Sequence, residues 1–154
     1  MTEPEAAITA IDKRIVTFLQ SQTVLTLAVS KDSSPYCATC FYAYSPEHNA
    51  LIFKSSGETR HVVIGLENHS VAGSVLPDKL ITGKVKGIQF SGLFEKPEGT
   101  VLSDLQKVYY RKYPFAMAMS GDLWIVRLGW VKFTDNTLGF GTKLTWSANM
   151  PDLK

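Results

Sequence analysis

The sequence predicts an α+β protein built on a small antiparallel β-barrel of about six strands, interrupted by a few short helices. Short apolar and β-branched runs, separated by turn-forming residues, recur along most of the chain. The helical segments are too few to supply the alternating βαβ units of a parallel sheet. With 154 residues, of which 45% are hydrophobic, residues 1–154 are expected to form one domain with one core.

The first part of the chain predicts a helix and a β-hairpin. Apolar residues recur at helical spacing over about residues 4–20, which indicates an amphipathic helix covering the barrel. Residues 24–30 and 36–44 have the composition of strands. Residues 31–35 (KDSSP) between them are turn formers, so these two strands should pair as a hairpin.

The middle of the chain continues with strands around one short helix. Residues 51–53 predict a third strand, and Gly57, Glu58 and Thr59 lead from it into a helix at 60–66. A fourth strand is expected at 71–76. Residues 80–94 alternate well and contain three glycines, which predicts one long, curved strand.

The last part predicts a helix, a long strand and a tail. Helical spacing at 101–109 lies between Gly99 and Pro114. Residues 123–133 alternate as a long strand, and a glycine-rich tail follows it. No internal repeat or low-complexity segment is present.

Charge and targeting signals narrow the function classes. A net charge of +2 and 19% charged residues lack the basic excess that nucleic-acid binding requires. The N-terminus (MTEPE) does not have the order of a signal peptide, and no apolar run approaches the ~20 residues of a spanning helix. A cytoplasmic protein without nucleic-acid or membrane partners is expected.

The sequence contains no strong signal for a metal or a catalytic triad. Cys37 and Cys40 spell C-x-x-C, but residues three apart on a strand point to opposite faces, so neither a disulfide nor a metal site is expected there. The histidines His48, His61 and His69 lack metal-ligand spacing. No Ser-His-Asp arrangement or close carboxylate pair supports hydrolysis.

The order of predicted elements resembles the flavin-binding split barrels of the pyridoxamine-5′-phosphate-oxidase-like superfamily over nearly the whole chain. Within it, the tail at 124–146, which contains VKFTDNTLGFG, is similar to a small family of uncharacterised bacterial proteins. The resemblance implies that the chain binds FMN and forms a homodimer with its sites between the subunits.

The resemblance implies a phosphate site where the third strand turns into its helix. The FMN phosphate would be held by Ser55, Ser56, Thr59, Arg60 and His61. Hydroxyls and amides at a helix start can donate to a dianion, and arginine adds a charged fork. The alternative is that the hydroxyls only cap the helix while Arg60 faces solvent. Lys54 is not clearly equivalent to the lysine that related oxidases add to this site.

The resemblance also places the flavin ring against the second and third strands. Ala38, Thr39, Cys40 and Phe41 occupy the second strand, where small residues beside an aromatic leave space for a flat ring. Gln89 is similar to a glutamine that relatives place near the flavin, often from the partner subunit. The alternatives are that Ala38 and Phe41 are core residues and that Gln89 is a surface residue.

The tail has two possible roles. Two glycines flank Phe140, which suggests a tight excursion that lines the cofactor pocket or forms an arm across the dimer. The preferred interpretation combines the two: an arm across the dimer that shapes the pocket. Trp124, Trp130 and Trp146 are further aromatic anchor candidates.

Three functions therefore remain open. The leading expectation is an FMN-dependent oxidoreductase acting on an unidentified small molecule. The second is a non-catalytic flavin- or haem-binding carrier or sensor, with His61 as an axial-ligand candidate. The third is a cofactor-free interaction module.

Overall fold

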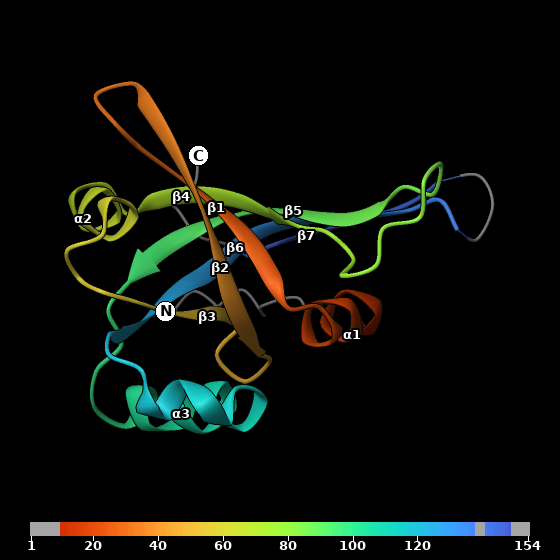
Figure 1. The fold of residues 1–154 in the computed structure, drawn as a ribbon. Coiled ribbons are helices and arrows are strands. Elements are labelled where there is room, and N and C mark those ends of the chain that lie inside the picture. The colour runs from red at the N-terminus through yellow and green to blue at the C-terminus, as the bar shows by residue number, and fades with distance from the viewer. Residues whose placement is uncertain (1–9, 138–140, 149–154) are drawn as a thin grey trace, which may run out of the picture.

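The computed structural model describes residues 10–137 and 141–148 as one antiparallel barrel with three α-helices (Figure 1). The elements in chain order are α1 (Lys13–Ser21), β1 (Val24–Lys31), β2 (Ser34–Ser45), β3 (Ala50–Ser55), α2 (Arg60–Glu67), β4 (Ser70–Val75), β5 (Lys86–Glu95), α3 (Gly99–Lys112), the short 3₁₀-helix η1 (Pro114–Ala118), β6 (Asp122–Asp135) and β7 (Thr142–Ser147). Within the described ranges, none of the helices has the length and apolar character needed to cross a bilayer.

Pairing of β6 with two different strands closes the barrel. The strand order is β3-β2-β1-β4-β5-β6-β7, and β3 also pairs with β6. The first half of β6 lies beside β3, where Phe53 is opposite Trp124, and its second half lies between β5 and β7. Six strands thus form the closed barrel, as predicted, and β7 extends the sheet beyond it.

Two apolar cores lie on the two sides of this sheet. The interior core contains large side chains with almost no exposure, including Leu25, Leu27, Phe53, Phe90 and Phe94. The second core lies outside the barrel, where α3 packs on β2, β3 and β6 through Leu105, Tyr109, Ile52 and Ile125. α2 packs on the interior side, with Val62 fully buried.

The predicted β1–β2 hairpin is confirmed, and its turn is explained by backbone geometry. The strands pair from Val24↔Phe41 to Lys31↔Ser34. Asp32 and Ser33 both have positive φ, at 49° and 63°, which matches the two-residue turn favoured by twisted hairpins.

The first helix starts later than predicted over the described residues. Residues 1–9 lie outside the described part, and α1 begins only at Lys13. The Asp12 carboxylate accepts a hydrogen bond from the Arg14 amide at 2.8 Å, and this cap sets the helix start. Ile15, Phe18 and Leu19 are buried, as the helical spacing predicted.

The single strand predicted over residues 80–94 is wrong in its first part. β5 begins only at Lys86. Residues 81–84 form a turn in which the Lys84 amide donates to the Ile81 carbonyl at 3.0 Å, and Gly83 has a φ of +85°. The alternating pattern of these residues predicted a strand, but they pair with no neighbouring strand and form a turn instead.

The tail contains a strand that the sequence did not predict. β7 pairs with β6 from Trp130↔Ser147 to Asp135↔Thr142, so the tail folds back as a hairpin strand. Trp124 and Trp146 are buried in the interior core and are not exposed anchors, whereas Trp130 is 37% exposed. Phe140 lies outside the described residues.

Candidate functional site

The turn from β3 to α2 gathers the hydroxyl groups of the candidate phosphate site. The Thr59 hydroxyl donates to the Ser56 carbonyl at 2.8 Å, and the Ser56 hydroxyl accepts from the Glu58 amide at 3.3 Å. Thr59 therefore stands at the N-cap of α2 without capping it through its side chain. The first amides of α2 have no partner within the helix and keep their capacity to donate to an anion.

Arg60 lies at the start of α2 and is turned toward the hairpin. Its guanidinium carbon is 4.7 Å from the centroid of the Tyr36 ring, a cation–π distance. No carboxylate of the described residues forms an ion pair with it. A hollow of about 520 Å³ adjoins it between the β1–β2 turn and α2, lined also by Lys31, Asp32, Ser34, Glu58, Val63, Ile64 and Glu67.

Ser55, His61 and Cys40 form a second group on the interior side of the same turn. The Ser55 hydroxyl and His61 Nε2 are 2.9 Å apart, and the Cys40 thiol interacts with Ser55. Burial raises the pKa of Cys40 to about 11 and lowers the pKa of His61. Both side chains are therefore uncharged at neutral pH, and neither carries the fixed positive charge that a phosphate would need.

Thr39 and Gln89 lie at the two ends of one cross-strand row on the outer face of the sheet. Cross-strand partners in antiparallel strands point to the same face, and the pairs Thr39↔Thr26, Thr26↔Ser74 and Ser74↔Gln89 are continuous. A hollow of about 460 Å³ lies on this face, lined by Thr23, Val24, Thr26, Ser74, Leu76, Pro77 and Asp78. The hollow lies over the two middle residues of this row, Thr26 and Ser74, whereas Thr39 and Gln89 do not line it.

The four candidates on β2 divide between the two faces of the sheet. Ala38 and Cys40 pair with Leu27 and Leu25, whose side chains fill the interior. Thr39 and Phe41 point outward, and Phe41 is 56% exposed with its ring centroid 6.0 Å from that of Tyr113. The core interpretation therefore fails for Phe41, whereas Ala38 faces the interior and is half-buried.

Lys54 is occupied elsewhere and does not belong to the phosphate turn. Its ammonium donates to the Ala116 and Met119 carbonyls at 2.7 and 2.6 Å, and to the Tyr110 hydroxyl at 3.0 Å. These three bonds use all the donors of the group and tie β3 to η1 and α3. Lys54 therefore has a structural role, and it does not replace the lysine that related oxidases add to the phosphate site.

Sequence reasoning missed three residues of these surfaces. Tyr36 lies beneath Arg60. Strand alternation puts Tyr36 on the same face of β2 as Ala38, but nothing in the sequence shows that α2 packs against that face. Thr26 and Ser74 are polar residues on apolar strands, and that signal could have marked them. Cys37 is exposed and Cys40 is buried, both as free thiols, as strand geometry predicted.

The curated relatives show the family. A protein of Cronobacter sakazakii is 40% identical over 143 residues, which cover 91% of this chain and 94% of the relative. YhbP of Escherichia fergusonii is 34% identical over 139 residues, covering 90% and 92%. Both are UPF0306 proteins, whereas a scan against protein-family models found no match.

Solved structures show the fold class. A heme binding protein from Mycobacterium smegmatis superposes with a TM-score of 0.72 at 17% identity, covering 85% of this chain and 55% of that one. A FAD-binding protein from Mesorhizobium loti gives 0.63 at 18% identity, covering 79% and 91%. A pyridoxamine-5′-phosphate-oxidase-like protein from Listeria innocua gives 0.61 at 11% identity, covering 79% and 95%.

The closed barrel and these neighbours define the fold as that of the pyridoxamine-5′-phosphate-oxidase-like split barrels. Within this class, the chain belongs to the UPF0306 family. Fold alone does not assign an activity, so the function has to be argued from the site.

Proposed function

We propose that this protein is a cytoplasmic FMN-binding homodimer that acts as a flavin-dependent oxidoreductase on a small molecule. The observation that carries the proposal is the turn between β3 and α2. There Arg60, which pairs with no carboxylate of the described residues, adjoins helix amides that the Thr59 side chain does not cap. Flavin supplies hydride and electron transfer when bound, so no side chain of this chain has to react.

The donor set of the turn fits a phosphate dianion. The hydroxyls of Ser56 and Thr59, the first amides of α2 and the Arg60 guanidinium are all donors. Arg60 is exposed and rests on Tyr36, so it can turn toward an anion by changing only side-chain rotamers. Ser55 and His61 lie deeper and orient the turn through their mutual hydrogen bond.

The outer face of the sheet fits a flat ring. Thr39 and Gln89 bear hydroxyl and amide groups that can donate to and accept from the polar edge of a flavin, and Phe41 offers an exposed aromatic surface. These groups and the phosphate turn lie on different parts of one subunit. A site shared between two subunits, with Gln89 supplied by the partner, can join them.

An exposed apolar surface supports the dimer. Phe41, Leu76 and Trp130 are 56%, 57% and 37% exposed around the outer face. Large apolar side chains that are exposed on one face can serve as contacts of an association surface. The two free thiols, Cys37 and Cys40, agree with a reducing cytoplasm.

A haem carrier is the second candidate. His61 favours it, because burial lowers the pKa of this half-buried imidazole and the neutral form is the one that ligates iron. Its Nε2 would have to leave Ser55 to bind a metal.

The test is titration of the full chain with FMN and with riboflavin, followed by visible absorption and flavin fluorescence. FMN should bind more tightly than riboflavin. Arg60→Ala should weaken FMN about tenfold or more, the value of a charge-assisted bond, and leave riboflavin unchanged. Arg111→Ala, which removes an equally exposed arginine from α3, is the matched control.

Equal binding of FMN by wild type and Arg60→Ala would reject the phosphate site. If the wild type binds no flavin, the FMN proposal fails, and a haem titration of wild type and His61→Ala becomes the deciding measurement. Bound FMN that neither a nicotinamide donor nor a mild oxidant can turn over would identify a carrier. A chain that binds neither group would be an interaction module.

A further inference from the structure

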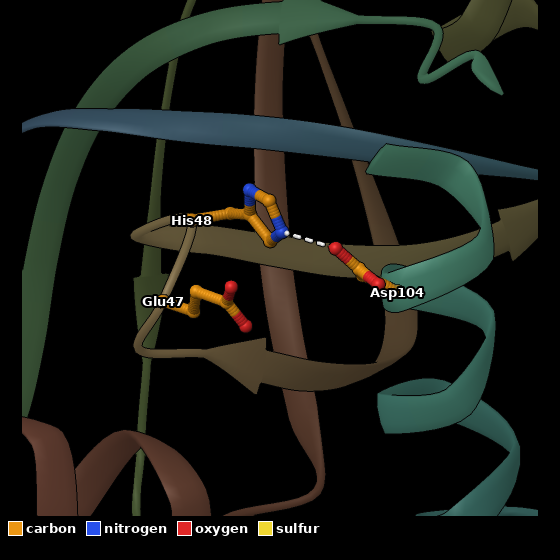
Figure 2. A group of neighbouring side chains, drawn as sticks. All are labelled: Glu47, His48 and Asp104. Atoms are coloured by element: carbon orange, nitrogen blue, oxygen red, sulfur yellow. Dashed lines mark hydrogen bonds and ion pairs between the residues drawn. The ribbon is translucent and has the colours of Figure 1, made fainter. Parts of the chain in front are cut away.

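Three donor side chains meet at the end of β3 opposite to the phosphate turn. Among residues 10–137 and 141–148, Glu47, His48 and Asp104 form the one group of three histidine, cysteine or acidic residues whose ligand atoms all lie within 4.8 Å of one another. Figure 2 shows Glu47 and His48 on the turn between β2 and β3, facing Asp104 on α3. These segments are distant in sequence, so histidine spacing alone could not reveal the group.

The distance between the two closest donor atoms of the group is compatible with two ligands of one metal ion. His48 Nε2 and Asp104 Oδ2 are 3.4 Å apart, whereas N–H···O hydrogen bonds are usually about 2.7–3.2 Å. Two ligands that each lie about 2.0–2.1 Å from a tetrahedral zinc ion are about 3.4 Å from each other. The imidazole and the carboxylate therefore already stand at the separation that such an ion requires.

The turn that carries Glu47 and His48 is held in place. The Tyr44 hydroxyl donates to Asn49 Oδ1 at 2.7 Å, and the Leu128 amide donates to the Asn49 carbonyl at 3.0 Å. The His48 amide donates to the Ser45 hydroxyl at 3.3 Å. A rigid turn lowers the entropy cost of bringing its donors to one ion.

The helix that carries the third donor, Asp104, is held in place by packing. Asp104 precedes Leu105, which is fully buried beneath α3, so the helix holds the carboxylate toward the turn. Glu47 is exposed and can swing in through side-chain rotation alone. The side chains of His48 and Asp104 are 24% and 44% exposed, so an ion can reach them from solvent.

We propose that Glu47, His48 and Asp104 bind a divalent cation of the zinc type, which ties the β2–β3 turn to α3. One imidazole and two carboxylates suit a borderline cation, whereas Mg²⁺ and Ca²⁺ prefer oxygen ligands alone. The two carboxylates balance its charge. Three protein ligands leave one position open to water or an added ligand, and Glu47 and His48 also line a hollow of about 430 Å³ that reaches Arg127.

The experiment is calorimetric titration of the untagged, EDTA-treated full chain with Zn²⁺ near neutral pH. One site per chain is expected, and Co²⁺ should develop the intense visible absorption of tetrahedral coordination at the same stoichiometry. His48→Gln and Asp104→Asn should each bind Zn²⁺ at least about tenfold more weakly, with Glu47→Gln as a third variant. His69→Gln and Asp122→Asn remove equivalent exposed groups elsewhere and should bind as wild type.

Absence of saturable Zn²⁺ binding by the wild type would overturn the proposal, and so would unchanged binding in both His48→Gln and Asp104→Asn. The pair would then be only a half-exposed ion pair. Circular dichroism of each variant distinguishes the loss of a ligand from the loss of fold. The result does not depend on whether the chain binds FMN.

Discussion

His61 is a half-buried histidine whose Nε2 lies 2.9 Å from the Ser55 hydroxyl. Burial lowers its pKa below the ordinary value of 6.5. A histidine with a lower pKa in the folded chain binds fewer protons folded than unfolded, so its contribution to stability rises with pH. That contribution is complete above the unfolded pKa and is lost as the pH falls below 6.5 toward the folded value.

The expected outcome is a steeper acid destabilisation in wild type than in His61→Gln, which keeps a partner for Ser55 but cannot titrate. Thermal unfolding between about pH 7.5 and pH 5 measures it, because only the wild type must take up a proton at this position on unfolding. Parallel curves for wild type and His61→Gln would contradict the lowered pKa.

The contact of β5 with β6 depends on a glycine. The register of these strands shifts between Ser91 and Gly92, and a Cβ atom at Gly92 would lie 2.2 Å from the Arg127 carbonyl oxygen and 2.9 Å from Val126 Cγ1. No real Cβ approaches a backbone oxygen so closely, so any side chain would push the two strands apart.

Gly92→Ala should lower the free energy of unfolding by about 2 kcal/mol or more. Urea denaturation followed by tryptophan fluorescence measures the loss, because Trp124 and Trp146 are buried in the adjoining core. Gly57→Ala is the matched control, since a Cβ there meets only Trp124 Cζ2, at an ordinary 3.7 Å. If Gly92→Ala and Gly57→Ala had the same free energy of unfolding, β6 would have to move away from the new methyl group without loss of stability, which would contradict the prediction.

At the scale of the whole molecule, the proposed dimer predicts that the two subunits associate through the outer face of the sheet. One cross-strand row consists of the small residues Cys37, Ala28, Ala72 and Ser91 and ends at Trp130. Small side chains let a partner sheet approach closely, and an aromatic ring at the edge supplies apolar contact. The site proposed for FMN adjoins this face.

Analytical ultracentrifugation should give twice the chain mass of 17.0 kDa. Trp130→Lys should sediment as a monomer and lose FMN binding together with the dimer, because the proposed site needs both subunits. Val101→Lys places the same charge on α3 at a similarly exposed position, 38% against 37% for Trp130, and should remain dimeric. A monomeric wild type that still binds FMN would refute the shared site.

Local patterns sufficed for most elements and for the class of fold. Alternation in β1 and β2, the turn formers between them and the apolar spacing of Ile15, Phe18 and Leu19 are properties of neighbouring residues, and the structure agrees with them. The start of β5 and the existence of β7 were not predicted, because pairing partners decide whether a segment with no strong pattern becomes a strand.

The sequence by itself determined the antiparallel barrel, the opposite faces of Cys37 and Cys40 and the gathering of hydroxyls before α2, because each follows from the period of a strand or the start of a helix. Only the tertiary structure decided what meets across the chain. It placed Arg60 on Tyr36, engaged Lys54 with η1, aligned Thr39 with Gln89 and brought His48 to Asp104. Such contacts arise from barrel closure and helix docking, which no local pattern encodes.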